Sequence, residues 1–282
     1  MPATIKTKLK LNQTIHKLSR LLPLGARNRL YPLYLDAAAI LIHGSRYYPK
    51  GIGIEMSTAC NRACGYCPVS THRIKQRFIT DDLLVKIIQR LREFRYDGCI
   101  NFSFYNEPLI DPNFSRRVKI VHDALPGCIL QIYTNGDKLE RAVLAELMDA
   151  GISTVWVSRH PPYKYEWDKR IFALAKEFPR CVEVVEIGAM VWRNRGGLVR
   201  DLPLPNVMAG ATMCRMPEYS NITIDGDMLL CCCDFNRENS LGNLNDKSMH
   251  DVYFGQAAVE CRRRLRRGDF NVSRMCQECI KK

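Results

Sequence analysis

Strands and helices alternate along the chain from Gly51, and this alternation limits the fold more than any other feature. Runs rich in β-branched and aromatic residues predict five strands, at residues 52–57, 99–104, 129–134, 154–158 and 182–191. Helical stretches with end signals separate them: Thr80 starts one, and the stretch 138–150 stops at Gly151. This order predicts a parallel sheet with right-handed crossovers. Five or six strands are too few for a closed eight-stranded barrel, so we expect an α/β fold with a partial, open barrel.

The alternation stops after residue 191, which predicts a second, smaller region. Pro203 and Pro205 mark a linker, and a hairpin is expected around the turn 225–227, with one strand running to residue 233. Residues 248–267 predict a single helix. We therefore divide the chain into three predicted regions: a basic extension (1–49), the partial barrel (50–200) and a small α+β domain (201–282). The last is too small to build much core alone, so a bound metal centre would help it to fold.

Charge is spread unevenly over the 282 residues, whose net charge is +13. Residues 1–50 hold nine Lys or Arg and a single acid, Asp36, and a second basic run occupies residues 262–267. Such runs can bind nucleic acid, anionic substrates or acidic partners, or simply form a solvated surface. The longest apolar stretches, such as 35–42, are well below the roughly 18–20 residues of a membrane span, so no span is expected.

Thirteen cysteines are present, and their spacing is uneven. An odd count without a secretion signal argues against a disulfide scaffold and favours a reducing, cytoplasmic location. In such a compartment clustered thiols more often bind metals or iron–sulfur clusters. We therefore expect the clustered cysteines to be metal ligands.

The first cysteine group follows the first predicted strand. Cys60, Cys64 and Cys67 have the spacing C-x-x-x-C-x-x-C. Three thiolates can hold three irons of a [4Fe–4S] cluster and leave the fourth iron open, as a catalytic site requires. The alternative is a structural zinc knuckle, for which His72 would supply the fourth ligand.

The string CNRACGYC at residues 60–67 resembles the signature of the radical S-adenosylmethionine (SAM) superfamily. The resemblance implies that these three cysteines hold the SAM-cleaving cluster, and that SAM chelates the open iron through its amino and carboxylate groups. It also places the aromatic residue before the last cysteine, Tyr66, near the adenine.

Two further segments strengthen the resemblance, because each ends a successive predicted strand. The segment YNEPL at 105–109 stands where the family has a Gly-Gly-Glu-Pro motif, although Asn106 replaces the second glycine. By resemblance Glu107 would bind the SAM ammonium through a charge-assisted hydrogen bond. The turn Thr134-Asn135-Gly136 is similar to a Thr-Asn-Gly turn of the family and adds Asn135 to the predicted SAM site.

The ends of the fourth and fifth strands supply weaker candidates. Ser158 and Arg159 lie where family members often place polar groups against the SAM carboxylate or ribose. For Arg159 a surface ion pair is an equally weighted alternative. Residues 192–197 follow the fifth strand and are expected to face the substrate.

The second cysteine group resembles the auxiliary-cluster domain called SPASM, or twitch in its shortened form. The resemblance rests on the spacing of Cys214, Gly226, Cys231, Cys276 and Cys279. Four thiolates would hold a second [4Fe–4S] cluster, and a zinc ion bound by four cysteines is the alternative.

The triplet 231–233 requires a choice of ligand. In a strand, Cys231 and Cys233 project to one face and Cys232 to the other. Family spacing selects Cys231, with Cys233 as the second choice. Whichever is spare would point toward the cluster side and lie near the substrate.

The resemblance implies an oxidoreductase with two [4Fe–4S] clusters and SAM as cofactors. A one-electron donor such as a flavodoxin or ferredoxin would start SAM cleavage to methionine and a 5′-deoxyadenosyl radical, which abstracts a substrate hydrogen atom. Relatives with one auxiliary cluster include dehydrogenases of amino-sugar alcohols. Because the chain has no extra domain to grasp a leader peptide, we expect oxidation of a polar small molecule, for example one derived from a sugar.

Three alternatives stay open. A radical epimerase or peptide-modifying enzyme would use the spare Cys233 as a catalytic hydrogen donor. RNA modification would explain the basic runs, although no RNA-binding module is visible beyond the barrel, so nucleic acid is not favoured as a partner. A zinc-binding interaction protein without enzymatic activity is the third.

Overall fold

One eight-stranded sheet organises the molecule. The computed structural model describes residues 24–72, 75–186, 190 and 192–281. The strand order is β5-β4-β3-β2-β1-β6-β7-β8, and every pair from β5 to β6 is parallel. The strands are β1 (Gly51–Ile54), β2 (Cys99–Asn101), β3 (Ile129–Thr134), β4 (Ile152–Arg159), β5 (Val182–Glu186), β6 (Tyr219–Ile222), β7 (Asp227–Leu229) and β8 (Ser240–Asn243).

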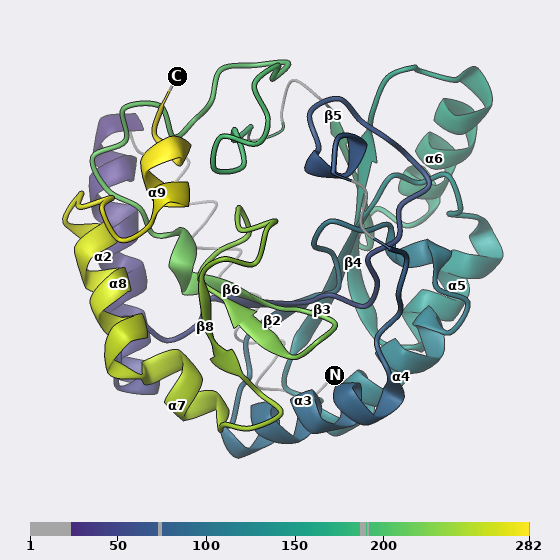
Figure 1. The fold of residues 1–282 in the computed structure, drawn as a ribbon. Coiled ribbons are helices and arrows are strands. Elements are labelled where there is room, and N and C mark those ends of the chain that lie inside the picture. Colours follow the sequence, from purple (N-terminus) through teal and green to yellow (C-terminus); the bar gives the residue numbers. More distant parts are fainter. Residues whose placement is uncertain (1–23, 73–74, 187–189, 191, 282) are drawn as a thin grey trace.

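Helices cover the outside of the parallel strands and of the C-terminal region (Figure 1). The α-helices are α2 (Leu24–His43), α3 (Asp81–Glu93), α4 (Phe114–Ala124), α5 (Arg141–Asp149), α6 (Tyr165–Glu177), α7 (Met249–Phe254), α8 (Gln256–Arg266) and α9 (Arg274–Cys279). Short 3₁₀ helices are η1 (Pro68–Ser70), η2 (Pro108–Ile110) and η4 (Met216–Glu218).

Helix α3 shows how the sequence sets these elements. The Thr80 side chain accepts a hydrogen bond from the Leu83 N–H at 3.3 Å, so the helix begins at the predicted cap. Asp81 in the first turn suits the positive end of the helix dipole. Apolar residues then recur every three to four positions and are buried against the sheet, namely Leu84, Ile87, Ile88 and Leu91.

The C-terminal region shares the sheet of the barrel. Strand β6 pairs in parallel with β1, with Gly51 opposite Tyr219 and Ile54 opposite Ile222. Strands β7 and β8 then continue the sheet in antiparallel fashion. Because β1 leads into the first cysteine loop and β7 leads into the cysteine triplet, this pairing places both groups on one body.

The predicted α/β fold with an open sheet of about five to six parallel strands is confirmed, since β5 and β8 form two separate edges. The three predicted domain boundaries stay predictions. Within the described ranges, no helix is both long and apolar enough to cross a membrane.

Several predicted elements differ in detail. The strand expected to reach residue 233 ends at Leu229, because the Asp234 carboxylate accepts the N–H groups of Glu238 and Asn239 and draws the chain into a turn. The helix expected at 248–267 is two helices, because Gly255 between them is extended, with φ −53° and ψ 146°. The fifth strand ends at Glu186, and most of the remaining predicted range lies outside the described residues.

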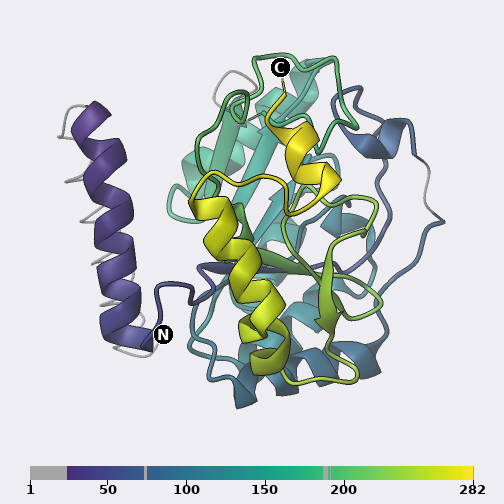
Figure 2. The same cartoon turned by 60° about the vertical axis from the view of Figure 1, so that its left-hand side comes forward.

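The basic N-terminal region contains a helix that the sequence analysis did not predict. Helix α2 forms an outer layer beyond α8 (Figure 2). Its Asp36 accepts hydrogen bonds from Arg215 at 2.5 Å and from Arg266 at 2.7 and 2.9 Å. These contacts lower the pKa of Asp36 to about 2 despite its burial, so the carboxylate stays charged and fixes α2 to the C-terminal region.

We expect Gly53→Ala to destabilise the protein, because a Cβ at this position would lie 2.1 Å from the Asn221 Oδ1 on neighbouring β6. Overpacking of a buried site costs about 1–3 kcal/mol. Thermal unfolding of the anaerobically prepared protein measures the effect. Gly127→Ala is the matched control, since its Cβ would lie 3.6 Å from the Asp97 Cβ, an ordinary van der Waals contact. Equal melting temperatures for the two variants would show that the β1–β6 contact is less tight than described.

Candidate active site

Four loops that carry the predicted site residues meet at the carboxyl ends of β1 to β4. The loop with the first three cysteines is tied to the turn after β3. Arg62 forms a two-point ion pair with Asp137, at 2.8 and 2.5 Å, and Asn61 donates to the same carboxylate at 2.9 Å. Carboxyl ends of parallel strands are where barrels gather their active sites.

The three thiols of this loop are partly buried. Burial raises the pKa of Cys60 to about 11, and burial also raises the pKa of Cys67. The Arg62 N–H points at the Cys60 sulfur at 3.5 Å, a contact that favours the thiolate. Loading of iron must therefore displace protons from these thiols.

Glu107 is buried beneath this loop, with an exposed fraction of 2%. Its Oε1 accepts from the Thr134 hydroxyl at 2.6 Å and from the Leu109 N–H at 3.2 Å. Its Oε2 accepts from the Asn135 N–H at 2.7 Å. A carboxylate offers about four acceptor positions. One position on Oε2 is left, which fits a single further donor such as an ammonium group.

The two predicted asparagines hold the loops in place. The Asn106 Oδ1 accepts from the Phe104 N–H at 2.7 Å, so the residue that replaces a family glycine closes its own turn. The Asn135 amide donates to the Asn61 side chain at 2.8 Å and joins the β3 turn to the cysteine loop.

Tyr66 stands in an aromatic group. Its hydroxyl lies 2.6 Å from the His160 Nδ1, and its ring meets Trp192 edge to face at 4.6 Å. Burial, with the nearby charge of Arg62, lowers the pKa of His160 to about 4, so this imidazole is neutral at pH 7. This arrangement fixes the ring of Tyr66 and fits a wall for a planar base.

The two candidates at the end of β4 differ in setting. Arg159 forms a two-point pair with Asp168 at 2.7 and 2.6 Å and also contacts Glu186 at 3.2 Å. These contacts match the alternative in which Arg159 forms an ion pair and does not contact SAM. Ser158 is half-buried beside Val185 of β5.

The second cysteine group lines an apolar cavity. Leu230, Leu265 and Phe270 form part of its wall. The thiols that line it are those of Cys214, Cys231, Cys233, Cys276 and Cys279. Five sulfur atoms are available for a cluster that needs four, so the predicted ligand set is brought together with one thiol to spare.

The triplet lies in a turn and not in a strand, yet Cys231 and Cys233 line the same cavity and Cys232 does not, as the strand argument predicted. The Cys231 sulfur accepts the Cys233 N–H at 3.3 Å, and such bonds stabilise a ligating thiolate. The Cys233 thiol contacts those of Cys231, Cys232 and Cys279. It also lines a second, larger pocket, so Cys233 faces both the cysteine cavity and open space.

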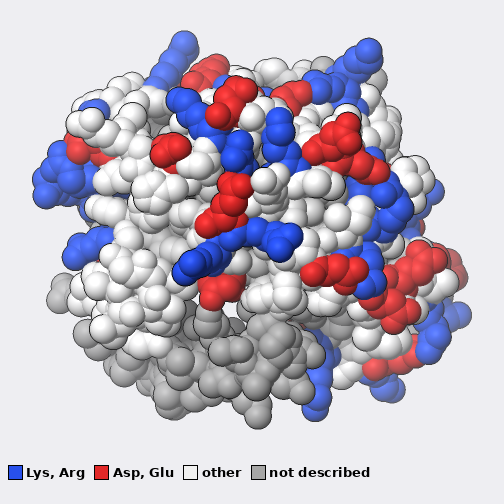
Figure 3. All heavy atoms as spheres, turned by 90° about the horizontal axis from the view of Figure 1, so that it is seen from below, with Lys and Arg blue, Asp and Glu red and all other residues white. Residues whose placement is uncertain are grey.

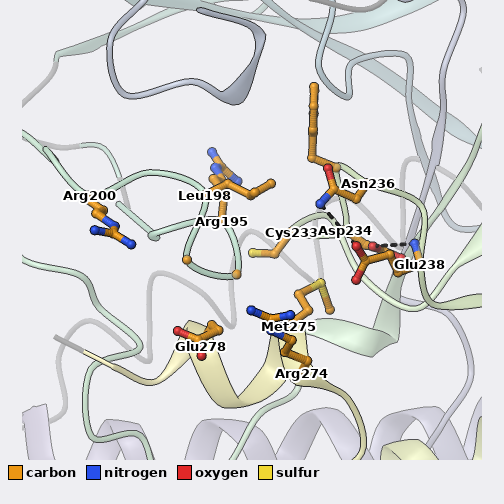
Figure 4. Close-up of a pocket in the computed structure, with 13 residues that line it drawn as sticks. Arg195, Leu198, Arg200, Cys233, Asp234, Asn236, Glu238, Arg274, Met275 and Glu278 are labelled. Atoms are coloured by element: carbon orange, nitrogen blue, oxygen red, sulfur yellow. Dashed lines mark hydrogen bonds between the residues drawn. The ribbon is translucent and has the colours of Figure 1, made fainter. Parts of the chain in front are cut away.

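Arg195 connects the two cysteine groups. It has a left-handed φ of 52°, and its guanidinium lies 5.7 Å from the Tyr105 ring centre. Its charge acts on Cys67 of the first group and on Cys232 and Cys233 of the second. Arg195 and Cys233 line one pocket with a volume of about 480 Å³ (Figure 4).

The zinc alternative and the iron–sulfur alternative require different ligand geometries. No three His, Cys, Asp or Glu side chains in the described ranges lie close enough to hold one metal ion. A single zinc draws its ligands to about 2.3 Å, whereas each thiolate of a cubane binds a different iron. His72, the fourth ligand of the zinc alternative, contacts Thr71 at 2.9 Å and the ring of Phe235.

Sequence profiles of known families match both halves of this site. The profile described as "Radical SAM superfamily" matches residues 54–178, and that described as "Iron-sulfur cluster-binding domain" (SPASM) matches residues 214–280. The chain contains a radical SAM domain followed by a SPASM iron–sulfur cluster-binding domain. The predicted radical SAM enzyme, its two [4Fe–4S] clusters and SAM as cofactor are thereby confirmed.

Individual relatives agree with this assignment. The S-adenosyl-L-methionine-dependent 2-deoxy-scyllo-inosamine dehydrogenase of Niallia circulans is 29% identical over 230 residues, covering 81% of this chain and 91% of the relative. The crystal structure of BtrN in complex with AdoMet and 2-DOIA is 28% identical with a TM-score of 0.74, covering 82% of this chain and 92% of that one. Streptococcus suis SuiB bound to precursor peptide SuiA, at 12% identity and a TM-score of 0.52 over 92% of this chain and 79% of that one, shares the fold.

Sequence reasoning missed part of the site. Neither His160 nor the Asp137 that holds Arg62 was named, although His160 directly follows the predicted pair Ser158 and Arg159. The stretch 192–197 was expected to face the substrate, and its Arg195 lines the larger pocket. The roles of the individual site residues stay predictions.

We expect Cys231→Ala to lose about four irons per chain and to destabilise the C-terminal region, because metal binding and folding are coupled there. Cys233→Ala is expected to keep both clusters. Iron and sulfide analysis after anaerobic reconstitution, with Cys181→Ala as a buried control outside both groups, measures the difference. Loss of four irons from Cys233→Ala alone would make Cys233 the ligand.

Proposed function

We propose that this protein is a radical SAM dehydrogenase that oxidises an alcohol carbon of a polar small molecule related to sugars and cyclitols. The observation that carries the proposal is the pocket beside the second cysteine group. It is walled by Arg195 and Cys233, and charged or amide side chains line much of the rest. A pocket of about 480 Å³ suits a small molecule. The dehydrogenase named above supports this reaction class, since it aligns over 81% of the chain.

Different residues of the chain would bind SAM and orient the substrate. When bound, the first cluster and SAM supply a radical that removes a hydrogen atom, and the second cluster supplies an electron acceptor. Glu107 has one acceptor position left for the SAM ammonium, and Tyr66 offers its ring to the base. Arg195 holds a positive charge near cysteines of both groups, where it can orient a substrate hydroxyl group.

Electron supply and location remain proposals. A flavodoxin or ferredoxin would reduce the first cluster, close to the exposed residues Asn61, Ala63 and Gly65. All thirteen cysteines are free, which supports a reducing compartment, the cytoplasm.

Epimerisation is the second candidate, and one observation favours it. Cys233 reaches the pocket, where a thiol could return a hydrogen atom to substrate. Peptide modification has less support, because the likeness to the peptide-bound SuiB shows the fold alone.

RNA modification is disfavoured by the basic run near the C-terminus. Arg262 is 1% exposed and lies over the Tyr253 ring at 3.7 Å. Arg263, Arg264 and Arg266 pair with Glu260, Asp269 and Asp36 respectively. On the described part of the face in Figure 3, basic and acidic side chains alternate, and no broad cationic surface forms.

Replacing Cys60, Cys64 and Cys67 together with alanine should remove about half of the iron and all cleavage of SAM by dithionite-reduced protein. Chromatography of 5′-deoxyadenosine measures the cleavage. Cys99→Ala/Cys128→Ala is the matched control, with cysteines outside both groups. Persistent 5′-deoxyadenosine in the triple variant would contradict the radical SAM assignment of these ligands.

Glu107→Gln should weaken SAM binding by about ten-fold or more while keeping the iron, because it removes a charge that can meet an ammonium ion. Calorimetry with SAM on the anaerobic protein measures the affinity. Unchanged affinity with intact clusters would exclude Glu107 from SAM binding.

Product mass separates the two candidate reactions. Dehydrogenation removes two hydrogens from substrate, whereas epimerisation leaves the mass unchanged. Turnover of aminocyclitols and amino sugars with SAM and dithionite should yield products lighter by about two mass units, in both wild type and Cys233→Ala. An unchanged mass together with an inverted centre, lost in Cys233→Ala, would establish the epimerase instead.

A further inference from the structure

The pocket beside Cys233 of the second cysteine group has a cationic end and an acidic end. Figure 4 shows Arg200 and Glu278 on one side of Cys233, and Asn236 and Glu238 on the other. A pocket with separated charges selects a ligand whose own charges match them.

At the cationic end, Arg200 and Arg274 act electrostatically on the nearby Glu278 carboxylate. Neither Arg200 nor Arg274 makes a side-chain hydrogen bond or ion pair with any residue of the described ranges, and both are exposed. Glu278, which lies near both, already pairs with Lys281 at 2.6 Å. Two guanidinium groups therefore remain for an anion, and guanidinium groups suit phosphate in both charge and geometry.

The acidic end contains two carboxylates, and only one of them is available to a ligand. The Asp234 carboxylate is buried and accepts the N–H groups of Glu238 and Asn239, at 3.0 and 2.7 Å. Glu238 is exposed, and its carboxylate accepts only from the Asn236 amide, at 3.3 Å, among described side chains. Glu238 is thus the acid that can meet a ligand ammonium group.

The cationic end also leads into more space. A second cavity of about 650 Å³ shares Gly197, Arg200 and Glu278 with the first pocket. Gly197 has a φ of 87°, and its missing side chain leaves the Glu278 Cβ 3.0 Å from where a Cβ would stand. A ligand bound beside Cys233 therefore has room for a substituent that projects toward Arg200.

We propose that the substrate is zwitterionic: an amino sugar or aminocyclitol that carries a phosphate monoester. Its phosphate lies between Arg200 and Arg274, its ammonium group meets Glu238, and the carbon to be oxidised lies beside Arg195 and Cys233. This inference rests on the proposed function and specifies its substrate class.

The test is calorimetric titration of the anaerobic holoenzyme with SAM bound. Three probes are compared: glucosamine 6-phosphate, glucosamine and glucose 6-phosphate. We expect glucosamine 6-phosphate to bind about ten-fold or more tightly than either of the others, because each lacks one of the two charges. In the double variant Arg200→Gln/Arg274→Gln, the affinity for glucosamine 6-phosphate should fall to the affinity for glucosamine. The affinity of this variant for glucosamine should equal that of the wild type. In Glu238→Gln, the affinity for glucosamine 6-phosphate should fall to the affinity for glucose 6-phosphate.

Arg263→Gln is the matched control, since it removes an exposed arginine on α8 that pairs with Glu260 and does not line the pocket. Equal affinities for the three probes, no binding of any probe, or an unchanged preference in the double arginine variant would overturn the proposal. Cleavage of SAM by the dithionite-reduced protein is measured in parallel in the same preparations. Cleavage without the expected preference refutes the substrate class alone, whereas absence of cleavage in wild type refutes the proposed function.

Discussion

Parallel pairing of β6 with β1 is the contact on which the rest of the structure depends. Strand β1 ends where the first cysteine loop begins, and β6 leads through β7 to the triplet. A sheet fixes its neighbouring strands at about 4.8 Å, so the two cysteine groups cannot drift apart without breaking this ladder. The Tyr105 hydroxyl adds a second link by donating to the Cys232 carbonyl at 2.9 Å. Such a rigid frame holds two redox centres at a fixed separation.

Burial of charge at this junction has a functional meaning. Arg195 has no carboxylate partner in the described ranges, and the groups that raise its pKa against the effect of burial are Tyr105 and cysteines of both groups. A half-buried cation without a nearby anion is unfavourable. Thiolates bound to iron would supply the missing negative charge, so cluster loading and the placement of Arg195 support each other. The same residue is thereby kept charged at the wall of the pocket.

Much of the fold and the first cysteine site could be predicted because their signals are local. The Thr80 cap, the strand periods and the spacing of Cys60, Cys64 and Cys67 all act within a few residues. The triplet was harder, because its turn is set by Asp234 accepting N–H groups four and five residues ahead, and a run of three cysteines contains no sign of that. The break at Gly255 could not be predicted either, because one glycine in a helical pattern does not show that its backbone is extended. The pairing of β6 with β1 joins residues about 168 positions apart, and no local pattern encodes it.

The C-terminal region shows why iron–sulfur chemistry and folding belong together in this chain. Its separate small core consists of Leu230, Leu265, Phe270 and Met275 together with the cysteines 231, 233 and 276. Thiols thus form a large part of the apolar packing, and burial raises the pKa of Cys276. Without iron, these side chains pack as small hydrophobes; with iron, they become thiolates held by metal bonds. Since the Cys233 wall of the pocket belongs to the same core, the shape of the pocket and the loading of the second cluster are coupled.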